Sequence, residues 1–391
     1  MLKNIQEVKN YLYSLIPIEG GRGIFRISQV LKKLNNPQDS FKSIHITGTS
    51  GKSSTAYLIS AILKQAGYKV GLFISPHLQD IRERIQINNQ PISQKDFADL
   101  IKSQKIRLSY FETLAAIAFA YFAKNKSDFG VIEVACGART DPTNILKSEI
   151  AIITNIGLDH QNLLGKTKKE ILENKMAIIK SSCDYVILPK KHDFQTKNHL
   201  IKSNYSRFDF YNSEKIIKDI KLTMPGIFQV ENAGIAIAAC LKLGVTKNII
   251  KNTLAKVFFP GRLEIIKNNI ILDGAHNPDK IKALVNSLKI IYPDQKFVTI
   301  FAVKKGKAAK KMLKLLAKIS SKIIITEFSE QTDLADKFKL KAHDLFNQVK
   351  AKNIICQPNF KKALENAQKQ ENLILITGSL YLAGETKKYL C

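Results

Sequence analysis

Short runs of β-branched and aromatic residues alternate with helical patterns along most of the chain, and this alternation limits the fold more than any other feature. It predicts parallel strands with helices on the faces of the sheet. In the first part of the chain the predicted strands are Ser43–Thr47, Lys69–Ile74, Phe129–Val134, Ile150–Thr154 and Tyr185–Leu188. The predicted helices are 53–66, 110–124 and 167–178, the first of them ended by Gly67 as a C-cap glycine.

The alternation pauses once and then restarts, which predicts a second domain. A helical stretch at 231–256 is followed by Phe258-Phe259-Pro260-Gly261-Arg262, whose proline and glycine predict a turn. Beyond it, helices alternate again with strands near Ile270 and at 297–301, 322–326, 353–355 and 373–377. Because 391 residues exceed one ordinary hydrophobic core, we expect an α/β domain over 1–258 and a smaller one over 262–391.

The net charge of +28 does not by itself indicate a nucleic-acid partner. Only eight of the 61 basic residues are arginine, and the 53 lysines are scattered along the chain. Proteins that read bases and phosphates rely on the planar fork of arginine and place aromatic side chains beside a basic stripe. The chain has neither feature, so we expect a solvated, lysine-rich surface that steers anionic substrates, and no nucleic-acid partner.

Cysteine usage and hydropathy indicate a reducing compartment. The five cysteines are far apart and form no CxxC pair, which argues against a zinc site or a disulfide framework. The first eleven residues are polar and charged, unlike a signal peptide, and no apolar run approaches the length of a membrane span. We therefore expect a cytoplasmic protein without a membrane partner.

A glycine-bearing loop, Thr47-Gly48-Thr49-Ser50-Gly51-Lys52-Ser53, lies between a predicted strand and a predicted helix. Glycines let backbone N–H groups approach phosphate oxygens, Lys52 can neutralise phosphate charge, and the Ser53 hydroxyl can face Mg²⁺. These residues predict a nucleoside triphosphate site formed by Gly48, Thr49, Ser50, Gly51, Lys52 and Ser53. The strict GxxxxGK[ST] pattern fails at Ile46, so the loop alone also allows an ordinary strand–turn–helix junction.

Further short motifs follow one another in order through nearly the whole chain. They are Arg22-Gly23-Ile24 with Asn36-Pro37, Ser75-Pro76-His77-Leu78, Tyr110-Phe111-Glu112, Glu133-Val134 with Gly137-Ala138-Arg139, Thr154-Asn155-Ile156-Gly157-Leu158-Asp159-His160, Pro260-Gly261-Arg262, Asp273-Gly274-Ala275-His276-Asn277-Pro278 and Thr377-Gly378-Ser379-Leu380. Accidental agreement of eight ordered motifs is very rare.

This series resembles the folylpolyglutamate/dihydrofolate synthases of the Mur ligase superfamily, which carry the same Gly-Thr-x-Gly-Lys-Ser form of the loop. The resemblance implies a P-loop ATPase-like parallel-sheet domain over 1–258 and a Rossmann-like C-terminal glutamate-ligase domain over 262–391. It implies an ADP-forming ligase that uses ATP to join L-glutamate to folate or dihydropteroate through an acyl phosphate. Another Mur-type ligase with a different acceptor, and a nucleotide-binding relic without activity, stay open as alternatives.

The same resemblance assigns the metal and catalytic residues. Mg²⁺ on the triphosphate would be held by Ser53, Ser75, Glu133 and His160, and the catalytic residues would be Lys52, Lys175 and His160. The family often carries the lysine matching Lys175 as a carbamate, so carbamylation of Lys175 is expected as an option, as is a monovalent cation. Lys180 is expected to be solvated.

Three more residues are expected at the nucleotide by resemblance: Asn232, and from the second domain Arg262 and Asp273. The family's Gly-x-His-Gln reads Gly226-Ile227-Phe228-Gln229 here, so a histidine contact is absent or replaced. A family segment that is commonly acidic reads Val303-Lys304-Lys305-Gly306-Lys307. Contacts with nucleotide or glutamate at these two segments are expected to differ from the family.

The acceptor is expected to bind at Tyr110, Phe111, Glu112, Thr140, Asp141 and Pro142, which correspond to positions that hold the pterin in bifunctional members. The family's usual Leu-Asp-Ala reads Thr140-Asp141-Pro142, so two of the three residues differ. The expected partners are small molecules alone, bound to a monomer. The residues leave open whether the first glutamate, later glutamates or both are added.

Overall fold

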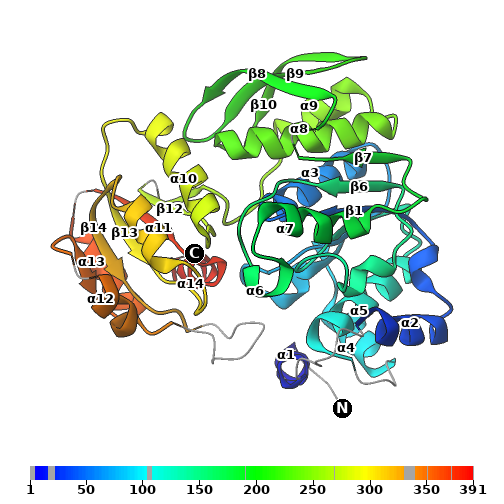
Figure 1. Cartoon of the computed structure of the whole chain (residues 1–391), viewed down its shortest axis with the longest axis horizontal. Helices are drawn as coiled ribbons and strands as arrows, with labels where there is room; N and C mark the ends of the chain where they lie inside the picture. The colour runs from blue at the N-terminus through cyan, green and yellow to red at the C-terminus, as the bar shows by residue number, and fades with distance from the viewer. Residues whose placement is uncertain are drawn as a thin grey trace. The chain divides into compact units, whose positions relative to one another are not determined.

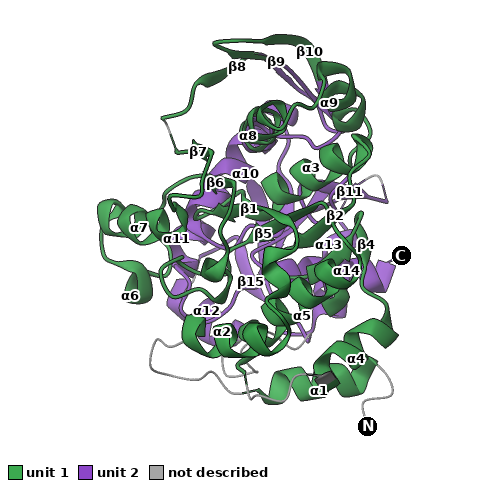
Figure 2. Cartoon of the chain, turned by 90° about the vertical axis from the view of Figure 1, so that its right-hand side faces the viewer, with its two compact units in different colours: residues 1–197, 209–220, 231–257 green, residues 198–208, 221–230, 258–391 purple. Residues whose placement is uncertain are grey.

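The computed structural model describes residues 5–15, 23–103, 108–189, 191–267, 269–329, 340–349, 351–370 and 372–390. Arg22, part of the first motif above, lies outside these ranges. The chain forms two compact units (Figure 2), the first within 1–197, 209–220 and 231–257 and the second within 198–208, 221–230 and 258–391. Two segments that we expected in the first domain, 198–208 and 221–230, therefore group with the second unit.

The first unit is built on a seven-stranded sheet in the order β4-β3-β2-β5-β1-β6-β7 (Figure 1). Its strands are β1 (Lys42–Thr47), β2 (Val70–Phe73), β3 (Ile85–Ile87), β4 (Gln90–Pro91), β5 (Phe129–Glu133), β6 (Ile150–Ile153) and β7 (Tyr185–Ile187). Five of them run parallel, and β3 and β4 add an antiparallel edge. The five predicted strands are confirmed to within one residue at each end, whereas β3 and β4 are too short for their pattern to predict them.

Helices cover this sheet and join its strands. They are α1 (Ile5–Ser14), α2 (Gly23–Lys33), α3 (Lys52–Gln65), α4 (Gln94–Ser103), α5 (Tyr110–Lys124), α6 (Gln161–Leu164) and α7 (Lys168–Lys175), with 3₁₀ turns η1 (Pro37–Asp39), η2 (Ile81–Arg84), η3 (Pro142–Ile145) and η4 (Met176–Ile178). Helix α5 begins at the predicted residue because Ser109 and Glu112 form a capping box. The predicted helix 167–178 is instead α7 followed by η4.

A three-stranded sheet, β10-β9-β8, follows in the chain and was not predicted. Its strands are β8 (Phe194–Ile201), β9 (Ser206–Asn212) and β10 (Ile216–Leu222). Buried and more exposed residues alternate along β9, as expected for a sheet with one covered face. The predicted helical stretch 231–256 is two helices, α8 (Ile227–Lys242) and α9 (Lys247–Leu254), because Gly244 turns the backbone between them with a φ of 81°.

The second unit contains a six-stranded sheet in the order β11-β12-β16-β13-β14-β15, parallel except for β11. Its strands are β11 (Glu264–Ile266), β12 (Ile270–Leu272), β13 (Phe297–Phe301), β14 (Ser320–Ile325), β15 (Ile354–Cys356) and β16 (Leu373–Thr377). Its helices are α10 (Pro278–Ile291), α11 (Ala309–Leu316), α12 (Ala342–Val349), α13 (Phe360–Gln368) and α14 (Leu380–Leu390). Both units are therefore α/β structures with mainly parallel sheets, which confirms the predicted fold class. Among the described helices, none has the length and apolar character that a membrane crossing requires.

Close packing of β2 against α5 gives the first testable prediction. A Cβ added to Gly71 would lie 2.5 Å from the fully buried ring of Phe122. We expect Gly71→Ala to lower the free energy of unfolding by about 1–3 kcal/mol, measured by urea denaturation, because a packed core cannot absorb an added methyl group. Adding Phe122→Leu makes room, so the double variant should lose less than the sum of the single losses. Full additivity would contradict the contact.

Candidate functional site

The predicted phosphate loop connects β1 to α3 at the carboxyl end of a central strand of the first unit. Gly48 has a φ of 149° and Gly51 one of 82°, in the region that favours glycine. Gly51 is the N-cap of α3, so the first unpaired N–H groups of that helix face the loop. Backbone donors at a helix N-terminus, with Lys52 at its first position, can bind an anion.

The segment that follows β6 holds this loop in place. Thr154 Oγ1 donates to the Ser50 carbonyl at 2.6 Å, and Ser50 N donates to Asn155 Oδ1 at 2.8 Å. Thr49 Oγ1 accepts a bond from Gly157 N at 3.0 Å and donates to Gly157 O at 3.2 Å. The motif that begins at Thr154 therefore shapes the phosphate loop.

Asn232, on α8, lies against the same loop. Its side chain is buried, and a Cβ built on Gly51 would come within 2.3 Å of Asn232 Oδ1. The structure thus brings this predicted nucleotide residue beside the loop, although α8 is about 180 residues further along the chain.

Glu133 is 2% exposed at the end of β5 and joins three segments. Its Oε1 accepts a bond from Ser53 Oγ at 3.1 Å and lies 3.8 Å from Lys52 Nζ. Its Oε2 accepts a bond from Ser75 N at 2.9 Å. Four of the predicted site residues, Lys52, Ser53, Ser75 and Glu133, therefore meet at one point.

Oxygen donors of this kind suit Mg²⁺, which commonly takes one or two protein carboxylates and completes its shell with phosphates and water. The Glu133 carboxylate and the Ser53 hydroxyl therefore fit a magnesium ion carried by a triphosphate, whereas Ser75 reaches this point through its backbone N–H and its role as a ligand stays a prediction. Within the described ranges, no three His, Cys, Asp or Glu side chains gather as a metal site of their own. His160 is the N-cap of α6, with a φ of 51°, and its Nε2 lies 3.9 Å from Asp159 Oδ1. Its role as a metal ligand stays a prediction.

Two lysines share one backbone acceptor in the loop. Lys52 Nζ and Lys175 Nζ each donate to the Gly48 carbonyl at 3.1 Å. Lys175 is 3% exposed. Burial, and next the charge of Lys52, lower the pKa of Lys175 to about 8. About a tenth of Lys175 is therefore neutral at pH 7, in the form in which an amine is nucleophilic.

The two stretches predicted to hold the acceptor lie side by side around Gly23, at the start of α2. A Cβ on Gly23 would lie 3.0 Å from Glu112 Oε1 and 3.3 Å from the Thr140 carbonyl, with Pro142 Cγ at 3.9 Å. Tyr110 is buried, and Phe111 packs against the ring of Phe73 with centroids 5.4 Å apart. Residues 110–112 and 140–142 are therefore neighbours around the start of α2, and we refer to these two stretches as the wall predicted to hold the acceptor.

The carboxylates in this wall already bind protein donors. Glu112 Oε1 accepts a hydrogen bond from Arg26 Nη2 at 2.6 Å. Its Oε2 accepts bonds from Arg26 Nε at 3.2 Å and from Ser109 N at 2.9 Å. Both carboxylate oxygens of Glu112 are therefore occupied by groups of the protein. Direct binding of an acceptor by Glu112 stays a prediction, and the observed bonds make it an organiser of the wall.

Asp141 is engaged in the same way. Its Oδ1 accepts bonds from Thr143 N at 3.0 Å and Thr143 Oγ1 at 2.5 Å. Its Oδ2 accepts bonds from Ala135 N at 3.0 Å and Cys136 N at 3.4 Å. Burial raises the pKa of Asp141, and these hydrogen bonds act in the opposite direction. Asp141 thus caps η3 and ties it to the segment after β5.

The expectation that Lys180 is solvated was wrong. Lys180 Nζ donates to the Leu146 carbonyl at 2.7 Å and also to the carbonyl of Asn144. Burial lowers its pKa. Lys180 therefore closes the end of the turn that contains Asp141, a role that its position in a lysine-rich stretch does not reveal.

Arg262 and Asp273 lie together in the second unit. Asp273 is buried and accepts bonds from Leu263 N at 2.9 Å and Ala275 N at 2.8 Å. Burial raises its pKa, and the charge of Arg262 partly offsets this rise. The Arg262 guanidinium lies over the ring of Phe259 at 5.7 Å. Asp273 therefore shapes the turn that carries Arg262, and the contact of either residue with a nucleotide stays a prediction.

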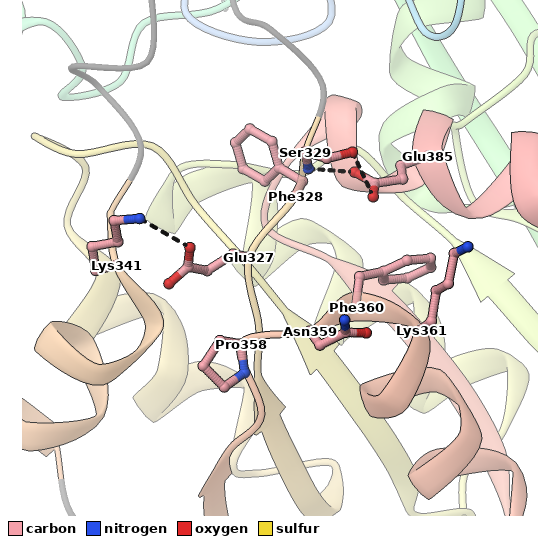
Figure 3. Close-up of a pocket in the computed structure, with 9 residues that line it drawn as sticks. All are labelled: Glu327, Phe328, Ser329, Lys341, Pro358, Asn359, Phe360, Lys361 and Glu385. Atoms are coloured by element: carbon pink, nitrogen blue, oxygen red, sulfur yellow. Dashed lines mark hydrogen bonds and ion pairs between the residues drawn. The ribbon is translucent and has the colours of Figure 1, made fainter.

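The second unit also has a cavity of about 500 Å³ near the carboxyl ends of β14 and β15 (Figure 3). Its lining residues are Glu327, Phe328, Ser329, Lys341, Pro358, Asn359, Phe360, Lys361 and Glu385. Its acidic groups bind neighbours in the cavity wall, Glu327 with Lys341 at 3.5 Å and Glu385 with Ser329 Oγ at 2.9 Å. The convergence of loop, lysines and carboxylate in the first unit is the stronger candidate for chemistry.

Sequence reasoning missed three residues of the site: Arg26, His45 and Thr143. Arg26 lies 86 positions from Glu112, so only the folded structure shows that the two residues are partners. His45 could have been singled out from the sequence, because an ionisable residue in an apolar strand needs a polar partner. Its Nε2 lies 2.9 Å from Thr143 Oγ1.

Comparison with known proteins agrees with this geometry. Residues 46–190 match the family model of the Mur ligase middle domain, and residues 262–389 match that of the dihydrofolate synthetase C-terminal domain. The dihydrofolate synthase/folylpolyglutamate synthase of Bacillus subtilis is 28% identical over 432 residues, covering 100% of both chains. The dihydrofolate synthetase of Saccharomyces cerevisiae is 30% identical over 412 residues, covering 93% of this chain and 96% of the yeast protein.

A solved structure extends the likeness to three dimensions. The folylpolyglutamate synthase of Mycobacterium tuberculosis, solved with ADP and AMPPCP, superposes with a TM-score of 0.88 at 25% identity over 99% of this chain and 98% of its own. Fold and phosphate loop together define a protein of the Mur ligase type. Within that class, the chain belongs to the dihydrofolate synthase/folylpolyglutamate synthase family.

The packing of Gly51 yields a prediction about anion binding. We expect Gly51→Ala to weaken binding of a non-hydrolysable ATP analogue about tenfold or more, measured by calorimetry, because the methyl group displaces the loop or Asn232. Gly67→Ala is the matched control, since Gly67 has a similar φ of 94° but open space around it. The contact with Asn232 is refuted if both variants bind the analogue like the wild type.

Proposed function

We propose that this chain is an ATP-dependent ligase that joins L-glutamate to a carboxylate of folate or dihydropteroate, with release of ADP and phosphate. The observation that carries the proposal is the convergence of Lys52, Ser53, Ser75 and Glu133 on a glycine-bearing loop at a helix N-terminus. Family membership supplies the substrate class, since the relatives are named for dihydrofolate and folylpolyglutamate synthesis.

The chemistry proceeds in two transfers. A carboxylate reacts poorly with amines because oxide is a poor leaving group, so its oxygen first attacks the γ-phosphorus of ATP and ADP leaves. The amine of glutamate then attacks the carbonyl carbon of the acyl phosphate, forming a tetrahedral intermediate that expels phosphate as the amine loses a proton. Both transfers depend mainly on positioning and on cations that stabilise negative charge. This scheme needs no serine or cysteine nucleophile.

Each group of the loop has a proposed task. Backbone N–H groups and Lys52 bind and orient the phosphates, while Asn232 holds the loop against α8. Ser53, Ser75, Glu133 and His160 would hold Mg²⁺, which would supply positive charge to the phosphate oxygens. The wall formed by residues 110–112 and 140–142 would hold the acceptor, with Arg26, Glu112 and Asp141 keeping its shape.

The proposal assigns the glutamate-ligase role to the second unit. We assign residues 262–391 as the glutamate-ligase domain and 1–258 as the ATP-binding domain, with Arg262 and Asp273 as nucleotide residues of the former. The remaining assignments are a cytoplasmic monomer, small-molecule partners only, and a monovalent cation as an optional cofactor. Another Mur-type ligase reaction is favoured only by Thr140 and Pro142, which replace the usual Leu and Ala.

Product analysis tests the reaction. We expect ADP and phosphate only when glutamate is present with dihydropteroate or tetrahydrofolate, and product mass separates first from later glutamate addition.

Glu133→Gln should lower kcat about a hundredfold because it removes the carboxylate beside the transferred phosphate. Glu149→Gln, in the same unit but paired with Lys42 at 3.5 Å, should leave kcat unchanged. Formation of AMP would refute the acyl-phosphate route.

Carbamylation of Lys175 is a separate proposal, supported by its burial and its lowered pKa. Only a neutral amine attacks CO₂. At fixed dissolved CO₂, the rate at which CO₂-depleted enzyme regains activity should therefore rise roughly tenfold per pH unit below pH 8 and level off above it. ¹³C NMR with labelled CO₂ should show a carbamate that Lys175→Arg removes and that Lys168→Arg, at an exposed position of α7, retains. An activity indifferent to CO₂ would exclude this role.

A further inference from the structure

A histidine sits at the centre of the apolar sheet of the first unit. His45 lies in the middle of β1, in register with Ile132 of β5 and Ala151 of β6, and its exposure is 0%. Both neighbouring positions on the strand, Ile44 and Ile46, are buried and apolar. A β-branched residue would suit this strand better, because an imidazole must find polar partners in a dry core.

The hydrogen bonds around His45 define its tautomer and show which group donates in each bond. Thr143 Oγ1 donates its proton to Asp141 Oδ1 at 2.5 Å, so it can only accept from His45 Nε2, at 2.9 Å. His45 therefore carries its proton on Nε2 and is neutral, which agrees with a pKa lowered to about 3 by burial and then by the charge of Lys180. Its Nδ1 is buried and has no hydrogen-bond partner among the described residues.

This chain of hydrogen bonds ends on Asp141, which together with Glu112 shapes the predicted acceptor wall. Asp141 Oδ2 binds the N–H groups of Ala135 and Cys136, two and three residues after Glu133. Thr47 Oγ1, at the end of the strand that carries His45, donates to the Gly137 carbonyl at 2.9 Å. The same strand thus leads into the phosphate loop and contacts the segment after Glu133.

We propose that His45 is a positioning residue for the acceptor: through Thr143 and Asp141 it fixes the turn 140–145 relative to the phosphate loop and Glu133. This inference rests on the proposed function, because it assumes that the turn faces the acceptor carboxylate. Without the Nε2–H donor, the Thr143 oxygen loses the bond that holds its side chain in place, so the hydroxyl no longer points steadily at Asp141. The turn then moves while the phosphate loop, held by Thr154 and Asn155, stays in place.

Steady-state kinetics on three variants tests the proposal. His45→Leu removes the donor, His45→Gln retains an N–H near the position of Nε2, and Thr299→Val removes a buried hydroxyl contact of the second unit, to Ser320 Oγ at 2.7 Å. We expect His45→Leu to raise the KM for the acceptor about tenfold or more while the KM for ATP changes less than about twofold. His45→Gln should restore most of the acceptor KM, and Thr299→Val should change neither constant.

Hydrogen exchange gives a readout that needs no substrate. The amides of Ala135, Cys136 and Thr143 donate to Asp141, so peptides covering 135–146 should exchange faster in His45→Leu and at the wild-type rate in His45→Gln. If His45→Leu does not fold, Thr143→Val replaces it and Thr143→Ser serves as its conservative partner.

The outcomes separate the two proposals. A wild type that turns over no folate-type acceptor refutes the proposed function, and hydrogen exchange still decides whether His45 fixes the turn. An equal rise of both KM values, or unchanged exchange in 135–146, overturns the positioning role. Failure of His45→Gln to rescue the acceptor KM overturns it as well.

Discussion

The buried carboxylate of Glu133 is the interaction on which the site depends. A charged oxygen pair at 2% exposure is costly unless it is fully hydrogen-bonded, and here the Ser53 hydroxyl and the Ser75 amide meet that need. Because these donors come from the start of α3 and the segment after β2, a single group holds three parts of the sheet edge together. The phosphate loop owes its place to this anchor as well as to its own glycines.

Charge balance around the loop follows from the same arrangement. Lys52 and Lys175 point their ammonium groups at one carbonyl, that of Gly48, and Glu133 contacts only the first of them at 3.8 Å. The charge of Lys52 disfavours a second cation at Lys175, although Asp141 and Asp159 act in the opposite direction, and burial makes an excess of positive charge costly. An incoming polyphosphate relieves that excess, and so would conversion of Lys175 into an anion. Either change lowers the electrostatic repulsion between the two lysines in the state that is ready for catalysis.

The parallel strands and the motif-bearing loops were predictable because each depends on local pattern, such as the apolar run of β5 or the glycines around Lys52. The sheet β8–β10 was missed because two of its strands lack the regular alternation of a one-sided sheet: β8 buries only its end residues Phe194 and Ile201, and β10 has the adjacent exposed pair Lys218 and Asp219. Pairs such as Arg26 with Glu112 were out of reach, since they depend on the packing of distant segments. The sequence shows that His45 is unusual in an apolar strand, but it does not show its partner Thr143, which lies 98 positions away.

The contact between Gly51 and Asn232 limits which residues each of these two positions can carry. The amide of Asn232 occupies the space in which a side chain at position 51 would lie. A larger residue at position 51 therefore needs a smaller one at position 232, and the φ of 82° at position 51 adds strain of its own. The choice of residue at one position thus limits the choice at the other, although a loop and a helix far apart in the sequence carry them.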